Sequence, residues 1–272
     1  AMKLPTIATI ALFSANVFAH SYTFSIVPQQ SASRLAEQWT PIMEMLSEKT
    51  GHTFVFTTAK NIPTFEENLA SEVYDFAYMN PYHLVSSNRT VGYTPIAKAK
   101  GKQIKGIIVV KKSSGIQSLE QLNDTTLAFP APAAFAASIL TRASLNAQGI
   151  AFEPNYVSSH DSVYLAVARG FYPAGGGIFR TFNALDESVR EQLTPIYTTQ
   201  GYTPHAIAHH PRIPDDVVLS VQTALTELAE TDEGKALLKP LRIPAFESAK
   251  NEDWNDVRAL DLDLTALNAK LD

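Results

Sequence analysis

The sequence predicts an α/β protein built as two lobes, joined by two crossover strands around a central cleft. Short runs of β-branched and aromatic residues alternate with apolar stripes at helical spacing, which is typical of parallel sheets covered by helices. The alternation breaks near residues 93–111 and then restarts, and further extended segments follow near 193–208. The chain has 272 residues, of which 45% are hydrophobic, and this is enough for two cores.

The first lobe begins with two strand–helix repeats. Strands are expected at 22–27, 53–57 and 75–79. Five apolar side chains at helical spacing predict a helix between the first two strands, and Gly51 is placed to end it. These five are Leu35, Trp39, Ile42, Met43 and Leu46. A second helix is expected over 61–69, with Thr64 and Glu67 forming a capping box.

The second lobe repeats the pattern after a basic turn. Ser118 and Gln121 predict the cap of a short helix at its start. The last first-lobe strand before this turn is expected at 93–97. In the second lobe, strands are expected at 104–110, 125–129, 155–157 and 172–174, and helices at 133–148 and 159–169. Extended segments at 193–198 and 202–208 follow, and two terminal helices are expected to pack on the first lobe. Their apolar stripes are Val217, Val218, Val221, Leu225 and Leu228, and Trp254, Val257, Leu260, Leu264 and Leu267.

The restart of the pattern defines the expected domains. Lobe 1 comprises residues 20–102 and 206–272, and lobe 2 comprises residues 103–205. Because ligands of α/β folds gather at the carboxyl ends of strands, the loops there should line the cleft. These loops are 28–31, 58–62, 79–82, 129–135, 157–161 and 174–180.

Residues 1–19 have the form of a secretory signal peptide. Lys3 precedes an apolar stretch from Ile7 to Val17, and Val17 and Ala19 stand at positions −3 and −1 of a cleavage site after Ala19. A buried N-terminal helix is the alternative, but the segment has no helix cap and no amphipathic pattern. We therefore expect a protein of the periplasm.

Composition excludes several classes of function. The chain has no cysteine, which rules out disulfides, thiolate catalysis and cysteine-based metal centres. With 22 basic and 27 acidic residues, the formal charge of −5 gives no reason to expect a nucleic acid as partner. Lys98, Lys100, Lys102 and Lys105 form a local basic patch that is expected to be solvated.

Three motifs resemble a known family in their order and spacing. They are Tyr74–Tyr82 (YDFAYMNPY), Ser113–Leu122 (SSGIQSLEQL) and Ser158–Val167 (SSHDSVYLAV). Together they resemble the phosphate/phosphite/phosphonate-binding family of periplasmic solute-binding proteins. The resemblance implies a type II periplasmic-binding fold and a non-catalytic protein that delivers a small molecule to an ABC transporter.

Two departures from that family affect the expected ligand. Family members that hold a phosphoryl group have Ser-Thr-Ser at the start of the helix that follows the 125–129 strand, whereas this chain has Ala131–Ala136 (APAAFA). The family's Val-Asp-Ala-Gly segment is here Tyr172–Gly177 (YPAGGG), so its aspartate is missing. Because hydrogen bonds to a charged group contribute roughly 1.5–3 kcal/mol each, simple phosphonates are expected to bind weakly.

Eight residues are candidates for ligand contact in the cleft. They are Tyr78, Asn80, Tyr82, Phe129, Ala134, Phe135, His160 and Arg180. The aromatic residues suit a ring or an apolar ligand body. The alternative is that they only pack against other side chains, and for Phe129 packing is favoured at least as much as ligand contact. The resemblance implies that His160 faces the cleft. Arg180 could pair with a ligand carboxylate or could lie solvated on the surface.

Other polar features have structural interpretations. Ser158 and Asp161 form a capping pattern, so a role for Asp161 in the cap is favoured over ligand contact. The glycine run 175–177 would let the backbone approach a ligand closely. His205, His209 and His210 could suggest a metal, but no third ligand has suitable spacing, and structural roles are favoured.

The leading functional interpretation is therefore a monomeric solute-binding protein, with an ABC permease as partner and with no catalytic residue, metal or cofactor. A ligand-binding protein that signals to a membrane sensor is the alternative, because sequence separates the two poorly. An enzyme on the same fold is disfavoured, since the chain has no nucleophile elbow and no metal motif.

Overall fold

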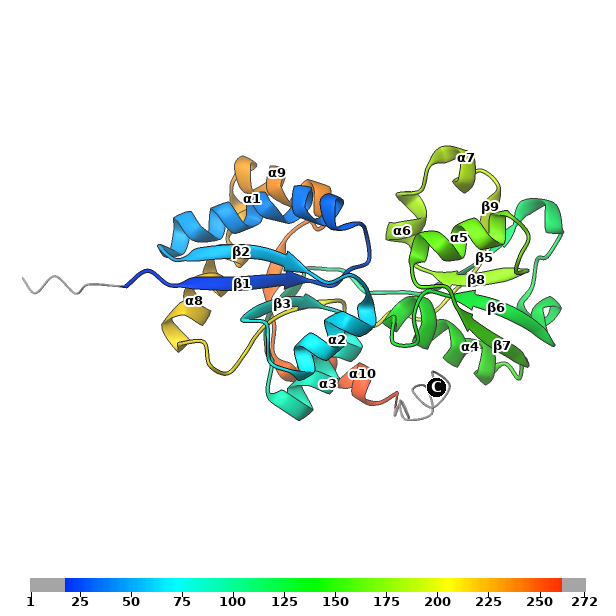
Figure 1. The fold of residues 1–272 in the computed structure, drawn as a ribbon, viewed down its shortest axis with the longest axis horizontal. Coiled ribbons are helices and arrows are strands. Elements are labelled where there is room, and N and C mark those ends of the chain that lie inside the picture. The colour runs from blue at the N-terminus through cyan, green and yellow to red at the C-terminus, as the bar shows by residue number, and fades with distance from the viewer. Residues whose placement is uncertain (1–17, 261–272) are drawn as a thin grey trace, which may run out of the picture.

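Two mixed β-sheets organise the chain, one in each of two lobes that lie side by side (Figure 1). The computed structural model describes residues 18–260. The first sheet has the order β11-β4-β10-β3-β1-β2. Its strands are β1 (Ser21–Ile26), β2 (Thr53–Thr58), β3 (Phe76–Met79), β4 (Thr94–Ala99), β10 (Ala206–His209) and β11 (Phe246–Ser248).

The second sheet has the order β7-β6-β8-β5-β9. Its strands are β5 (Ile107–Lys111), β6 (Thr125–Phe129), β7 (Phe152–Tyr156), β8 (Ala174–Gly177) and β9 (Leu193–Thr198). The first sheet therefore takes its strands from both ends of the described chain, and the second takes them from its middle. The expected boundaries after residues 102 and 205 fall between the strands of the two sheets and stay a prediction.

Helices cover both faces of each sheet (Figure 1). On the first lobe these are α1 (Ala32–Thr50), α2 (Ile62–Ala70), α3 (Pro81–Val91), α8 (Asp215–Thr226), α9 (Asp232–Leu238) and α10 (Asn255–Arg258). On the second they are α4 (Thr141–Ala147), α5 (His160–Ala168), α6 (Phe179–Asn183) and α7 (Glu187–Arg190). Short 3₁₀ turns lie at Lys112–Ser114, Leu119–Leu122, Leu228–Glu230, Lys239–Leu241 and Asn251–Trp254. No helix within residues 18–260 is long and apolar enough to cross a membrane.

The long helix α1 follows the sequence pattern closely. Its five-residue apolar stripe is buried, and Gly51 ends the helix in the left-handed conformation with φ of 76°. Ser31 caps the other end by accepting a hydrogen bond from the Arg34 backbone N–H at 3.3 Å. The predictions for this helix and for the strands on either side of it are confirmed.

The parallel pairing expected from the strand–helix repeats is confirmed for the first three strands, but each sheet as a whole is mixed. Strands β1, β2 and β3 are parallel, but β10 runs antiparallel to both β3 and β4, and β11 is antiparallel to β4. The second sheet likewise has antiparallel β5–β8 and β5–β9 pairs. The reason is connectivity, because the chain leaves the first lobe after β4 and re-enters it at β10 in the opposite direction.

Three helix starts differ from the sequence prediction. Asn80 and Pro81 do not simply end a strand but begin α3, where the Asn80 side chain accepts a hydrogen bond from the His83 N–H at 2.8 Å. Helix α2 is capped by Asn61, not by a Thr64 capping box. In α5 the capping residue is Ser159 rather than Ser158, because Ser158 has a positive φ of 81° and lies outside the helix.

The expected helix 133–148 is divided into two parts. A π-helical segment, η3 (Phe135–Leu140), comes first and runs directly into α4. Such wide turns are rare overall and are frequent at functional sites. This segment lies at the boundary between the lobes, and several of its side chains belong to the same apolar core as the first lobe.

The glycine run lets other segments of the protein pack closely on the second sheet, and its approach to a ligand stays a prediction. Gly175, Gly176 and Gly177 form strand β8 and are buried. A Cβ at these positions would collide with Val163, with the Ala137 carbonyl or with the Tyr164 ring. The glycines therefore allow α5 and η3 to pack directly on the sheet.

The two crossovers form a short ladder between the lobes. Ile104 and Tyr202 exchange backbone hydrogen bonds at 2.8 and 3.0 Å. Nearby, the Gly106 N–H donates to the Thr199 hydroxyl at 2.9 Å, and the Thr199 N–H donates to the Gly106 carbonyl at 2.9 Å. A Cβ on Gly106 would collide with the carbonyl oxygen of Ala136 in η3. The crossover and η3 are thus in direct backbone contact.

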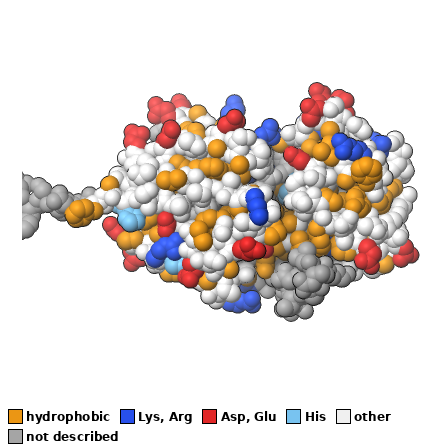
Figure 2. All heavy atoms as spheres, in the orientation of Figure 1, with side chains coloured by type: hydrophobic (Ala, Val, Ile, Leu, Met, Phe, Trp, Pro, Cys, Tyr) orange, Lys and Arg blue, Asp and Glu red, His pale blue; other side chains and the backbone are white. Residues whose placement is uncertain are grey.

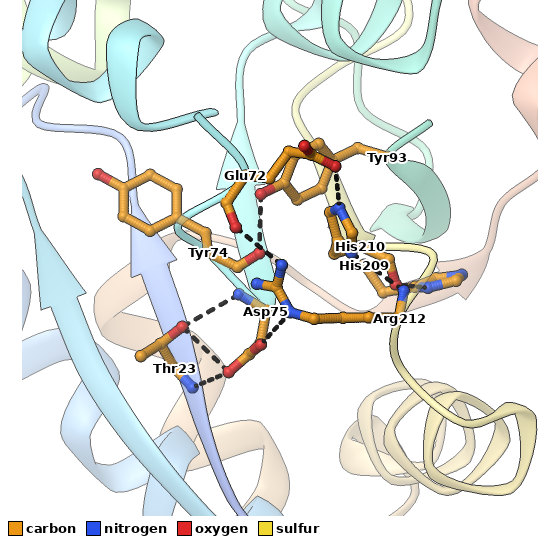
Figure 3. Close-up of polar contacts among 8 residues, drawn as sticks. All are labelled: Thr23, Glu72, Tyr74, Asp75, Tyr93, His209, His210 and Arg212. Atoms are coloured by element: carbon orange, nitrogen blue, oxygen red, sulfur yellow. Dashed lines mark hydrogen bonds and ion pairs between the residues drawn. The ribbon is translucent and has the colours of Figure 1, made fainter. Parts of the chain in front are cut away.

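A polar cluster joins three segments at the other end of β3 (Figure 3). The Asp75 carboxylate accepts hydrogen bonds from the Thr23 N–H at 2.9 Å and from the Arg212 guanidinium at 2.8 Å. His210 Nε2 lies 2.7 Å from a Glu72 carboxylate oxygen, while its Nδ1 accepts from the Arg212 N–H at 3.0 Å. His210 therefore has a structural role, holding the β10–α8 connection against β3.

The C-terminal helix is only partly described. Trp254 and Val257 are buried, and α10 packs on α3, as expected for a terminal helix that returns to the first lobe. Leu264 and Leu267, which complete the predicted stripe, lie outside the described residues.

Replacing Gly106 by alanine should lower the free energy of unfolding by about 1–3 kcal/mol, because the new methyl group has no space against the η3 backbone. Urea titration measures the change. Gly201→Ala on the opposite crossover is the control, since its methyl group would meet only the side chain of exposed Gln103. Equal losses in the two variants would contradict the close contact at Gly106.

Candidate functional site

The two lobes touch at the carboxyl end of β3. Asn80 Nδ2 of the first lobe donates a hydrogen bond to the Ala133 carbonyl of the second lobe at 3.1 Å. The Asn80 side chain also caps α3, so this one amide fixes a helix start and bridges the lobes. Asn80 is buried, with 2% of its surface exposed.

Alanines make the second-lobe side of this contact. Ala131, Ala134, Ala136 and Ala137 are buried and belong to the apolar core that includes the first-lobe sheet. Phe135 is also buried there, with its ring 6.0 Å from that of Tyr202 in an edge-on arrangement. The segment that carries hydroxyl groups in phosphoryl-binding relatives therefore serves here for apolar packing between the lobes.

An inner cavity lies beside this contact. First-lobe residues form most of its wall, and the second lobe supplies Arg180 and Thr181. The first-lobe residues are Ile26, Val27, Gln29, Gln30, Leu35, Trp39 and Tyr78. Its volume of about 10 Å³ is room for one water molecule. An organic ligand can therefore occupy this site only with the lobes further apart than they are here.

Two hydrogen-bond donors in the inner cavity have no partner. Trp39 is fully buried, and its indole N–H has no acceptor within residues 18–260. Arg180 makes no ion pair and no hydrogen bond with any residue of that same range. The positive charge of Arg180 lowers the pKa of His205. A guanidinium and an indole N–H without partners are groups of the kind that bind an anion.

A larger outer cavity of about 360 Å³ opens next to the inner one. It lies between the start of α1 on the first lobe and helices α5 to α7 on the second. Its lining is Gln30, Ser31, Arg34, Asp161, Leu165, Thr181, Ala184, Leu185, Asp186 and Val189. Figure 2 shows a notch between the lobes, with acidic and basic side chains at its edge.

Two buried histidines stand behind these cavities. His160 bonds through Nδ1 to the Thr181 hydroxyl at 3.1 Å, and the Tyr164 hydroxyl lies 2.7 Å from the same oxygen. The His205 ring lies 5.1 Å from that of Tyr78. The Nε2 atoms of His160 and His205 are buried and have no partner within the described part of the chain.

Burial keeps these histidines uncharged. It lowers the pKa of His160 to about 4. Burial also holds the pKa of His205 well below its usual range, and Arg180, His83 and His160 lower it further. Arg180 is therefore the positive charge in the lining of the inner cavity near neutral pH. This favours a ligand that brings a negative charge.

The structure brings some predicted site residues together and separates others. Tyr78 and Arg180 line the inner cavity, and His160 lies one hydrogen bond behind its wall. Asn80, Ala134 and Phe135 lie at the lobe contact. Their roles in ligand binding stay predictions.

Two of the predicted aromatic residues lie elsewhere. Tyr82 is half-buried on α3 and lines a separate surface cavity with Glu66 and Ser86. Phe129 is buried in the second-lobe core, 6.0 Å from the Phe152 ring and 6.2 Å from the Tyr156 ring. For Phe129 the packing alternative fits its surroundings.

Sequence reasoning missed three cavity residues. Trp39 was assigned to the core by its place in the apolar stripe of α1, and it is both a core residue and a cavity wall. Gln30 and Thr181 line both cavities but belong to no recognisable motif. The only available signal was their position in or next to the predicted cleft loops.

Within residues 18–260, no three His, Asp or Glu side chains are grouped closely enough to hold a metal ion. His205, His209 and His210 take separate positions. His205 lies at the lobe contact, His209 bonds to the His210 carbonyl at 2.9 Å, and His210 pairs with Glu72.

Comparison with known proteins gives a consistent result. The family described as ABC transporter, phosphonate, periplasmic substrate-binding protein matches residues 24–254. The phosphate-import protein PhnD of Mycolicibacterium smegmatis is 23% identical over 181 residues, which cover 60% of this chain. The chain spans 56% of the length of that curated relative.

Solved structures show the same fold. A binding protein component of an ABC phosphonate transporter from Pseudomonas aeruginosa is 16% identical, with a TM-score of 0.82 over 92% of this chain and 88% of its own. PhnD1 from Prochlorococcus marinus, solved with methylphosphonate, is 16% identical, with a TM-score of 0.81 over 91% of this chain and 98% of its own. The two-lobe, type II periplasmic-binding fold is thereby confirmed.

The free energy of unfolding should fall as the pH drops from about 7.5 to about 5, because the folded protein resists protonation of His160 and His205. An unfolded histidine titrates near 6.5, so this stability is complete above that pH and is lost as the pH falls toward 4. For His160 the loss at pH 5 is about 2 kcal/mol. Urea titrations at the two pH values measure it. His160→Asn should flatten the dependence, and an unchanged slope would contradict the assignment.

Proposed function

The chain belongs to the family of periplasmic phosphonate substrate-binding proteins of ABC transporters, and we propose that it delivers a small organic anion, rather than a simple phosphonate, to such a transporter. Members of this family bind their substrate and do not transform it, so the protein is not an enzyme. The ligand would be held between the lobes. The observation that carries the proposal is the unpaired Arg180 guanidinium in the inner cavity, opposite Trp39 and Tyr78.

The inner cavity suits an anion attached to an apolar body. Arg180 and the Trp39 indole N–H supply donors for a carboxylate or a similar group. The remaining lining combines the apolar side chains of Ile26, Val27, Leu35 and Tyr78, which favour a ring or hydrocarbon next to that group, with the polar side chains of Gln29, Gln30 and Thr181. Binding would begin with the lobes parted at the crossovers, and closure would bring Arg180 onto the anion.

A simple phosphonate lacks partners at the usual place. The residues at the start of η3 present methyl groups to the first lobe, and the Ala133 carbonyl is already engaged by Asn80. A doubly charged phosphonate would meet Arg180 without a set of hydroxyl donors to share its charge. We therefore propose that anion recognition has moved from the helix start to Arg180.

The N-terminal segment completes the proposal. Residues 1–19 would direct export and be removed after Ala19, so that the mature protein begins at His20. Mass spectrometry of the protein recovered from the periplasm tests this. A mass that still includes residues 1–19 would contradict cleavage at this position.

An organic carboxylate with an apolar body should bind through Arg180. The probe is 3-phenylpropanoate, with the uncharged 3-phenylpropanamide as comparator, measured by thermal shift and calorimetry. Arg180→Gln should weaken binding of the acid by about tenfold to a hundredfold, because it removes a charge-assisted hydrogen bond. Arg169→Gln, which removes an exposed positive charge outside both cavities, is the matched control.

Two outcomes would contradict the proposed ligand class. One is equal binding of the acid and the amide, or binding of the acid that does not depend on Arg180. The other is sub-micromolar binding of phosphate, phosphite or methylphosphonate, which would show that the hydroxyl-bearing helix start is dispensable for those anions.

A further inference from the structure

The outer cavity has the size and the walls of a ligand compartment. Its volume of about 360 Å³ falls within the range of small-molecule sites, roughly 300–1,000 Å³. Both lobes line it, so its shape depends on how far apart they stand. Leu165, Leu185 and Val189 give it an apolar wall on the second lobe.

The outer and inner cavities share part of their walls. Gln30 of the first lobe and Thr181 of the second line both of them. These two residues therefore mark the junction, with Arg180 and Trp39 on the inner side and Asp161 on the outer side. A ligand whose anionic group lies against Arg180 would extend past this junction into the outer cavity.

The polar groups change character across the junction. The inner cavity has two donors without a partner, namely the Trp39 N–H and the Arg180 guanidinium. At the junction, the Gln30 side-chain oxygen is buried and has no donor within residues 18–260. In the outer cavity, Asp161 makes no ion pair and no side-chain hydrogen bond with any residue of the described chain.

The charge of the outer lining is negative. Two carboxylates, those of Asp161 and Asp186, stand against one guanidinium, that of Arg34. The Asp186 carboxylate already accepts hydrogen bonds from the Ser188 N–H and hydroxyl. Asp161, whose side chain is exposed, and Gln30 thus offer acceptors that have no donor within residues 18–260, and acceptors in a negatively charged lining favour a protonated nitrogen.

We propose that the outer cavity is a second compartment of the ligand site, which receives a positively charged amine at the far end of the ligand. The transported molecule is then a two-ended organic zwitterion, with its acid at Arg180, an apolar body across the Gln30–Thr181 junction and its ammonium group at Asp161. This rests on the proposed function, because it takes the position of the acid from Arg180.

Pairs of compounds that differ only in the amine test this directly. One pair is 6-aminohexanoate and heptanoate, and the other is 4-(aminomethyl)benzoate and 4-ethylbenzoate. Each pair has equal chain length and nearly equal volume, so the ratio of dissociation constants within a pair isolates the ammonium group. In the wild-type protein the amine should strengthen binding of at least one pair by about tenfold, the low end for a hydrogen bond to a charged group.

The ratio should collapse to near one in Asp161→Asn and should persist in Glu187→Gln. Glu187 is an exposed carboxylate on α7, outside the cavity lining, and is the matched control. Because the two compounds of a pair are compared within one variant, any loss of stability from changing the first turn of α5 cancels. Gln30→Leu should reduce the ratio in the same direction.

The outcomes separate this inference from the proposed function. If both acids of a pair bind through Arg180 with equal affinity, or if Asp161→Asn leaves the amine preference intact, the second compartment is wrong and the anion site stands. If none of the four compounds binds, or if their binding survives Arg180→Gln, the anion site itself is wrong and the inference falls with it.

Discussion

The pairing of the two crossover segments is the constraint on which the rest of the structure depends. Ile104 and Tyr202 exchange two backbone hydrogen bonds, and Gly106 and Thr199 exchange two more. The absence of a side chain at Gly106 lets the crossover lie directly on the backbone of η3. This contact places the alanine-rich start of η3 against the first lobe. It thereby also fixes the positions of the side chains that surround the cavities. A change at the crossover would therefore alter the site without touching any residue that lines it.

The alanines of η3 and the arginine of α6 are complementary parts of one arrangement. Methyl groups at the helix start let the lobes approach until the Asn80 amide reaches the Ala133 carbonyl. Residues 131–136 carry no side-chain hydroxyl that could donate to a compact anion at the helix start. Arg180 lies at the other edge of the same contact, in a lining that includes Trp39 and Tyr78. On the function proposed above, this arrangement suits a larger organic acid better than a compact, highly charged group.

Electrostatics explains why a ligand should favour closure. Bringing a guanidinium into an apolar interface is costly unless a negative charge accompanies it. The buried histidines avoid that cost by remaining neutral, as the lowered pKa values of His160 and His205 show. Arg180 cannot do so, because an arginine keeps its proton under all physiological conditions. A bound carboxylate would satisfy it, and the energy gained would be available only when both lobes surround the ligand.

The sequence by itself determined the two-lobe α/β class, most helices and strands, and the order of motifs that marks the family. It also named Tyr78 and Arg180 among the candidates for the cleft. Periodicity was sufficient for the helices and strands because it reports which side chains are buried. It does not report what they are buried against, so Trp39 was indistinguishable from its neighbours in the α1 stripe, and the glycines of β8 were indistinguishable from a ligand loop. The antiparallel return of β10, the meeting of Gln30 with Thr181 and the two cavities were decided only by tertiary structure. They arise where segments about 150 residues apart in the chain come together, and no local pattern records such a contact.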